Sequence, residues 1–133
     1  MTHITLCENF TRTYKNNGQH LEQWFRYSLT GKIEKADNLK ATDGCDLFNY
    51  SIKSARATVC KGTDIDEHLA TDKATEFVYI TENLVAYIMN KTEYKKFVEL
   101  FARVDTESSK NGGSKKLRLG RETSKMLEWL TRQ

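Results

Sequence analysis

The chain of 133 residues is 38% hydrophobic, 11% aromatic and 29% charged, which supplies enough apolar material for one folded domain without staples. No apolar run approaches the roughly 20 residues that cross a membrane, and residues 1–10 lack the basic start and apolar stretch of a secretory signal. The three cysteines are odd in number and lack C-x-x-C spacing, so we expect free thiols in a reducing cytoplasm and no zinc site.

The first half of the chain predicts one helix followed by strands. After the turn at residues 16–18, Leu21, Trp24, Phe25 and Leu29 recur at helical spacing, which predicts an amphipathic helix that ends at Gly31. Residues 31–44 are polar and predict a loop. Strand-forming residues fill the segment 45–60, with a bend either near residue 49 or at residues 54–55.

The second half begins with a short predicted helix at residues 64–69, with Thr63 as its N-cap. Residues 77–81 and 84–89 are apolar on both faces and flank a Glu82-Asn83 turn, which predicts a hairpin of central, buried strands. A helix is expected from Tyr94 to Val104, then a loop, a short strand at residues 116–119 and a last helix around Leu127.

This order of elements predicts the fold class. We expect an α/β protein of the mixed α+β kind, in which helices flank a central mixed β-sheet. Residues 1–133 are expected to form a single domain that carries a basic carboxy-terminal segment, residues 108–133.

One short segment suggests a function. Gly44 and Asp46 form a G-x-D motif, and Ser51 to Ser54 follow as S-x-K-S on a predicted strand. With the element order, this pattern resembles the PD-(D/E)XK nuclease superfamily, which includes restriction endonucleases and archaeal-type Holliday junction resolvases. The resemblance covers about residues 18–104 and implies an αβββαβ core.

The resemblance also implies the site residues. The glutamate of the first helix would be Glu22, the strand acid Asp46, and the tripeptide on the next strand residues 51–53, which end at Lys53. Asp43 and Asp37 are alternatives for the strand acid. Serine stands where the family usually has a carboxylate, so Ser51 would be a supporting residue. One branch of restriction enzymes also has S-x-K and takes its second carboxylate from the following helix, which nominates Glu67 here.

The chemistry of phosphodiester hydrolysis explains this choice of residue types. Mg²⁺ prefers hard oxygen ligands such as carboxylates, which Asp46, Glu67 and Glu22 would supply. A lysine beside the scissile phosphate offsets developing negative charge, which is the role expected of Lys53. Residues two apart on a strand face the same way, so Ser51 and Lys53 should share one face, with Ile52 turned into the core.

The charge distribution points to a polyanion as partner. Residues 110–132 hold seven basic side chains against two acids, whereas residues 62–82 hold six acids against Lys73 alone. The predicted DNA-binding residues are the following: Lys110, Lys115, Lys116, Arg118 and Arg121. A solvated helix face is the alternative explanation of the charge run.

The sequence therefore predicts a Mg²⁺-dependent DNA endonuclease of the restriction type, acting as a homodimer on double-stranded or branched DNA. A Holliday-junction-resolvase-like nuclease is the first alternative. The second is a non-catalytic phage- or plasmid-type module that binds DNA or protein on the same fold, in which Asp46 would cap a strand and Lys53 would protect a sheet edge.

Overall fold

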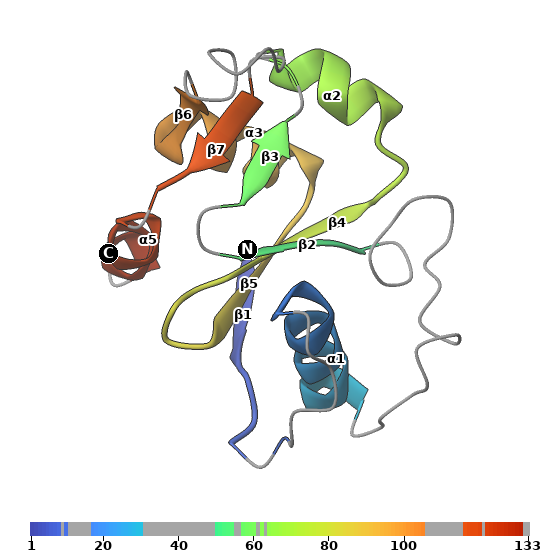
Figure 1. The fold of residues 1–133 in the computed structure, drawn as a ribbon, viewed down its shortest axis with the longest axis vertical. Helices are drawn as coiled ribbons and strands as arrows, with labels where there is room; N and C mark the ends of the chain where they lie inside the picture. Colours follow the sequence, from blue (N-terminus) through green and yellow to red (C-terminus); the bar gives the residue numbers. More distant parts are fainter. Residues whose placement is uncertain are drawn as a thin grey trace.

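A computed structural model describes most of the chain outside three longer segments and a few single residues or pairs (Figure 1). The described residues are 1–8, 10, 17–30, 50–54, 57–60, 62, 64–105, 116–120 and 122–131. Their elements are β1 (Thr2–Thr5), α1 (Asn17–Thr30), β2 (Tyr50–Ser54), β3 (Thr58–Cys60), α2 (Ile65–Thr71), β4 (Glu76–Ile80), β5 (Val85–Met89), α3 (Lys91–Phe101), β6 (Ala102–Asp105), β7 (Lys116–Leu119) and α5 (Thr123–Thr131). The predicted fold class, mixed α+β with a central mixed sheet flanked by helices, is confirmed.

A four-stranded mixed sheet forms the centre, with strand order β1-β5-β4-β2. The predicted hairpin is confirmed as β4 and β5, which pair antiparallel and occupy the two inner positions of this sheet. β2 pairs parallel with β4, with Ile52 opposite Val78. β2 is the last strand in this order, so among the described strands it is an edge strand.

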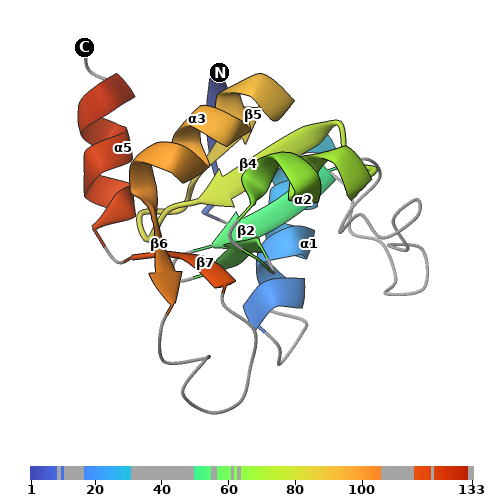
Figure 2. The same cartoon turned by 90° about the horizontal axis from the view of Figure 1, so that it is seen from above.

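Helices cover both faces of the central sheet (Figure 2). On one face, Phe25 of α1 packs with Ile52, Val78 and Ile80 in one apolar cluster. On the other face, side chains from α2, α3 and α5 form a larger cluster with the inner strands; its members include Leu69, Phe77, Tyr79, Phe97 and Leu127. Successive residues of β4 belong alternately to the two clusters, so the register of β2 with β4 shows which side chains of β2 face α1 and which face α2 and α3.

Three further strands form a second sheet, which the sequence pattern did not predict. Its order is β3-β7-β6, and both neighbouring pairs are antiparallel. Val59 and Leu119 face the larger apolar cluster, and Leu117 packs against it. The predicted strand at residues 116–119 is confirmed, but the two strands of the segment 45–60, β2 and β3, belong to different sheets.

The helix predicted to reach Val104 ends earlier. α3 begins behind a capping box in which Asn90 and Glu93 exchange hydrogen bonds, and it ends at Phe101. Ala102 is its C-cap with extended backbone, and residues 102–105 continue as β6. The prediction was wrong there because Val104 fits the helical spacing after Phe101, whereas in the fold it pairs with Leu117 across two strands.

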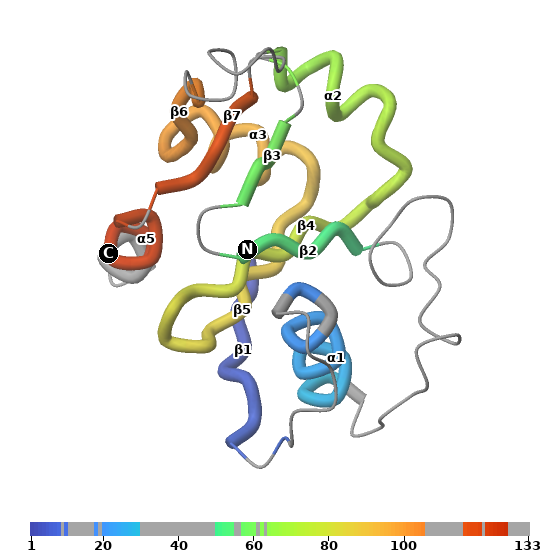
Figure 3. The backbone as a smooth tube through the Cα atoms, viewed as in Figure 1, coloured from blue at the N-terminus to red at the C-terminus, as the bar shows by residue number. Residues whose placement is uncertain are grey.

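The amino-terminal residues add a strand that the sequence did not predict. β1 pairs antiparallel with β5, with His3 opposite Tyr87, and it lies alongside β5 in the tube view (Figure 3). Among the described helices, none combines the length and the apolar character that crossing a membrane requires. Cys7 and Cys60 are free thiols, as predicted, and Cys45 lies outside the described residues.

Candidate catalytic strand and basic sheet face

Strand β2 carries the predicted tripeptide, residues 51–53, and its successive side chains point to opposite faces of the sheet. Ser51 and Ile52 are buried, with 9% and 8% of their surface exposed, and Lys53 is half-buried. Ile52 belongs to the cluster around Phe25 of α1. Ser51 and Lys53 therefore face the opposite side, which α2 and α3 cover (Figure 2). The prediction that these two side chains share a face, with Ile52 in the core, is confirmed.

Lys53 is the first of four residues with polar side chains that are register partners across the central sheet. Its register partner on β4 is Tyr79, whose partner on β5 is Tyr87, followed by His3 on β1. Residues in register on neighbouring strands lie side by side on one face, about 5 Å apart. Within the described part of the chain, no acidic side chain forms an ion pair with Lys53. A half-buried lysine thus lies beside a buried tyrosine without a described counter-charge.

Tyr79 connects this row to the start of α5. Its hydroxyl lies 3.3 Å from Oγ of Ser124, and that oxygen also accepts a hydrogen bond of 3.2 Å from the main-chain N–H of Glu82. Burial raises the pKa of Tyr79, the nearby charge of Glu82 adds to the rise, and the hydrogen bond to Ser124 opposes it. The phenol therefore stays protonated at neutral pH and acts as a neutral hydrogen-bonding group.

Glu22 lies on α1, on the other side of the sheet from Lys53. α1 packs on the face of Ile52 through Phe25, whereas the side chain of Lys53 is on the face of Tyr79. Glu22 is half-buried and has contacts within the protein. A shared site would have to form around the edge strand, where the two faces meet.

Glu67 lies in the first turn of α2, where its main-chain N–H donates 3.1 Å to the side chain of the N-cap Asp64. The cap is thus one residue later than the predicted Thr63, which itself lies outside the described residues. Ile65 and Leu69 of α2 are buried in the larger cluster. Successive helix residues turn by about 100°, so Glu67 is on the outward side, and it is exposed.

The predicted metal ligands do not form a complete site within the described residues. No group of three or more His, Cys, Asp or Glu side chains in that part of the chain is arranged to hold a metal ion. Glu22 lies on a helix that covers the opposite face of the sheet from Lys53, and Glu67 lies on a helix of the same face as Lys53 but on its outward, exposed side. Asp46, the third predicted ligand, lies outside the described residues, as do the alternatives Asp43 and Asp37.

The second sheet carries basic side chains on the face turned away from the core. Leu117 and Leu119 of β7 face the apolar cluster, so Lys116 and Arg118, which alternate with them, face outward. We call this surface the outer sheet face. It comprises Thr58, Arg103, Asp105, Lys116 and Arg118. Three of the predicted DNA-binding residues, Lys110, Lys115 and Arg121, lie outside the described residues.

Sequence reasoning missed Arg103 on this face. Arg103 is exposed and lies directly opposite Arg118 in the β6–β7 pair. The alternation of Ala102, Arg103, Val104 and Asp105 was the available signal, because apolar and charged residues take turns over four positions. Because Val104 also fits the helical spacing after Phe101, the sequence predicts a helix through Val104 instead.

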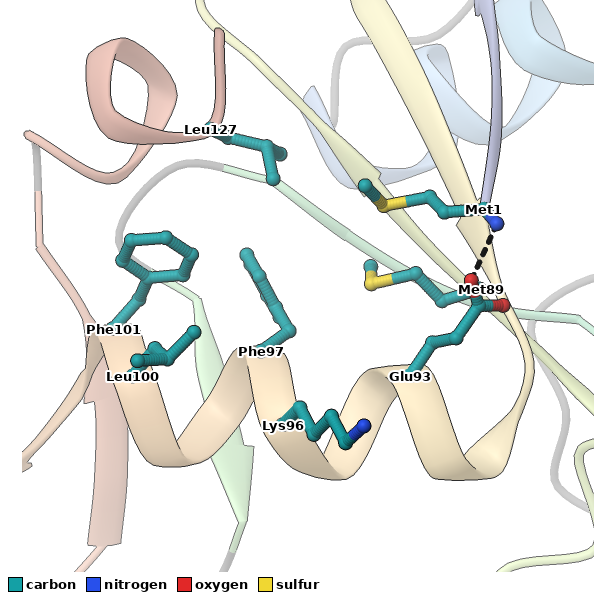
Figure 4. A pocket seen from close by; sticks show the side chains of 8 residues that line it. All are labelled: Met1, Met89, Glu93, Lys96, Phe97, Leu100, Phe101 and Leu127. Atoms are coloured by element: carbon teal, nitrogen blue, oxygen red, sulfur yellow. Dashed lines mark ion pairs between the residues drawn. The ribbon is translucent and has the colours of Figure 1, made fainter. Parts of the chain in front are cut away.

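A pocket lies elsewhere, between α3, α5 and the central sheet (Figure 4). It has a volume of about 310 Å³, and Phe97, Leu127 and Met89 are among its apolar walls. At its rim the amino group of Met1 forms an ion pair with Glu93. The hydrogen bond from that amino group, with the N–H of Asn90, lowers the pKa of Glu93. Of the predicted site residues that the structure describes, none lines this pocket.

Comparison with protein-family models, with curated proteins and with solved structures found no match to this chain.

Proposed function

We propose that the protein is a Mg²⁺-dependent endonuclease of the restriction type, which hydrolyses phosphodiester bonds in DNA. The observation that carries the proposal is the position of Lys53. This half-buried lysine shares a sheet face with Ser51 and has no acidic partner within the described residues. A cation held in this way is suited to an incoming phosphate, whose negative charge it would offset.

The neighbours of Lys53 support this role. The aromatic ring of Tyr79 lies next to the lysine on the adjacent strand, where it offers an apolar surface to the methylene stem. Ile52 anchors the strand in the opposite core. Strand β2 thereby presents Lys53 from a fixed backbone, and Ser51, buried two residues away on the same face, is a supporting residue of that strand.

We propose Mg²⁺ as the metal because residues 44–54 resemble the motif of the nuclease superfamily. Asp46 is the carboxylate that the proposal assigns to the metal, because Glu22 lies on the opposite face of the sheet from Lys53 and Glu67 lies on the outward side of α2. Cutting both strands of a duplex requires two such sites, so we propose a homodimer, acting on double-stranded DNA in the cytoplasm. A resolvase-like action on branched DNA is the alternative within the same chemistry.

A non-catalytic DNA-binding module is the second candidate function. The serine at position 51, where the nuclease superfamily usually has a carboxylate, favours it, as does the outward direction of Glu67 on α2. In that case Lys53 would serve β2 as a charged residue that discourages pairing at a sheet edge.

A divalent-metal titration with supercoiled plasmid DNA separates the two candidates. The endonuclease predicts nicked or linear plasmid in Mg²⁺ or Mn²⁺ and none in EDTA. The binding module predicts retarded plasmid in gels that stays supercoiled at every metal concentration. A four-way junction offered in parallel with the plasmid distinguishes a resolvase, which would cut the junction and leave the plasmid intact.

A further inference from the structure

Two arginines lie opposite each other on the outer sheet face. Arg103 of β6 and Arg118 of β7 are register partners in an antiparallel pair, and both are exposed. Like charges directly opposite each other on neighbouring strands destabilise a sheet. The ion pair of Arg118 with Asp105 offsets part of this repulsion, and an anionic partner that reaches both guanidinium groups would offset more.

The contacts of the two arginines leave donors available. Arg118 donates from Nε to Asp105 at 3.3 Å and from Nη2 to Oγ1 of Thr58 at 3.5 Å, which orients its guanidinium plane. Arg103 donates from Nη1 to the main-chain oxygens of Leu100 and Ala102. Its Nε and Nη2 atoms have no partner among the described residues, and no described acid forms an ion pair with it.

We infer that the outer sheet face holds the sugar–phosphate backbone of duplex DNA, with Arg103 and Arg118 donating to neighbouring phosphates of one strand. The choice of DNA as occupant rests on the proposed function; the anionic character of the occupant rests on the paired arginines. Arginine suits this role because its planar fork of N–H groups matches the oxygens of a phosphate. Lys116 lies two residues from Arg118 on the same side of β7, about 7 Å along the strand, and extends the basic surface.

Contacts of this kind position DNA without reading its sequence, because phosphates are the same at every base pair. The face therefore contributes affinity that is independent of sequence and sensitive to salt. A plot of log affinity against log salt concentration has a negative slope, and each lost phosphate contact reduces the magnitude of that slope by about 0.9.

The test is binding of a fluorescently labelled DNA duplex, measured by anisotropy in EDTA so that no cleavage interferes, over a series of salt concentrations. Arg103→Ala is expected to weaken binding about tenfold at low salt for duplexes of unrelated sequence, and to lower the salt slope by about one. Arg103→Gln, which keeps the length and polarity of the side chain, should do the same, and Arg103→Lys should restore part of the slope. Lys96→Ala is the matched control, because Lys96 is also basic and exposed but lies on α3.

An unchanged slope in Arg103→Ala and Arg103→Gln, with both variants folded, would overturn the inference. The inference would also be overturned if Arg103→Ala and Lys96→Ala lost the same affinity and slope, since the effect would then come from the total charge of the protein and not from the outer sheet face. The outcome is separable from the proposed function. If the wild-type protein cuts plasmid DNA but binding ignores Arg103, only this inference fails. If binding depends on Arg103 but no metal ion supports cleavage, the inference stands and the endonuclease proposal fails.

Discussion

Lys53 on β2 lies in register with Tyr79 on β4, so the lysine and the tyrosine are neighbours on one face of the central sheet. Tyr79 is fully buried, and its hydroxyl lies beside Oγ of Ser124 at the start of α5. This contact joins the central sheet to the carboxy-terminal helix, and it places a neutral phenol next to the cation on which the proposed chemistry depends.

Tyr79→Phe should lower the free energy of unfolding by about 1 kcal/mol at neutral pH, the usual net value of a hydrogen bond. The loss should not be larger, because the ring remains and Ser124 still accepts from the N–H of Glu82. Urea denaturation of both proteins measures it. A loss above about 3 kcal/mol would show that the hydroxyl has partners beyond Ser124.

The same variant should alter the alkaline limb of the stability curve. The folded protein holds the phenolic proton of Tyr79 more tightly than the unfolded chain does, because burial raises the pKa of this group. The resulting stability is complete below the unfolded pKa of about 10 and is lost as pH rises through the folded pKa. Wild-type stability should thus decline more steeply above about pH 10 than that of Tyr79→Phe. Parallel declines in denaturation series at increasing pH would contradict this.

Glu67→Gln tests whether a carboxylate on α2 serves the metal. Because Glu67 is exposed and directed away from the sheet, we expect cleavage within about twofold of wild type, and stability lower by a few tenths of a kcal/mol through the weakened helix N-terminus. Plasmid cleavage rates in Mg²⁺ and thermal unfolding measure the two quantities. A loss of two or more orders of magnitude in cleavage would show that Glu67 reaches the metal when DNA is bound, as the S-x-K branch of restriction enzymes implies.

Arg103→Ala should change the free energy of unfolding by no more than a few tenths of a kcal/mol, because relief of the repulsion between opposite strands offsets the loss of its exposed hydrogen bonds to Leu100 and Ala102. Arg118→Ala is the matched comparison. It removes an ion pair with Asp105, whose side chain is only 14% exposed, and should cost about 0.5 kcal/mol. Chemical denaturation of both variants measures these changes in the free energy of unfolding. A clear destabilisation by Arg103→Ala would give that residue a structural role in place of a binding role.

Much of the central sheet could be predicted from the sequence because its signals are local. The run from Phe77 to Met89 is apolar on both faces around a turn, and such a hairpin requires a buried, central position. The alternation of Ser51, Ile52 and Lys53 likewise determined which side chains share a face. Period-two alternation depends on the geometry of a single strand, so no knowledge of the tertiary fold was needed.

The remaining features depend on pairing between distant segments. β1 is a four-residue edge strand whose composition resembles many polar segments, and only its partner β5 identifies it. β6 was hidden because Val104 continues the spacing of α3, although the backbone becomes extended at Ala102. Arg103 was missed for this reason. The direction of Glu67 also could not be predicted, because it depends on Ile65 and Leu69 facing the core.

The most direct test of the endonuclease proposal compares Lys53→Ala with the wild-type protein in plasmid cleavage with Mg²⁺, with Lys96→Ala as control and DNA binding in EDTA measured alongside. The proposal predicts that Lys53→Ala loses cleavage by two to three orders of magnitude, as for removal of one strong electrostatic contact. Thermal stability should stay close to wild type, since a half-buried lysine with no ion pair among the described residues contributes little to it. DNA binding should weaken by no more than about tenfold, as for the loss of one phosphate contact. Cleavage by Lys53→Ala at the wild-type rate, or no cleavage by the wild-type protein with any divalent metal, would contradict the proposal.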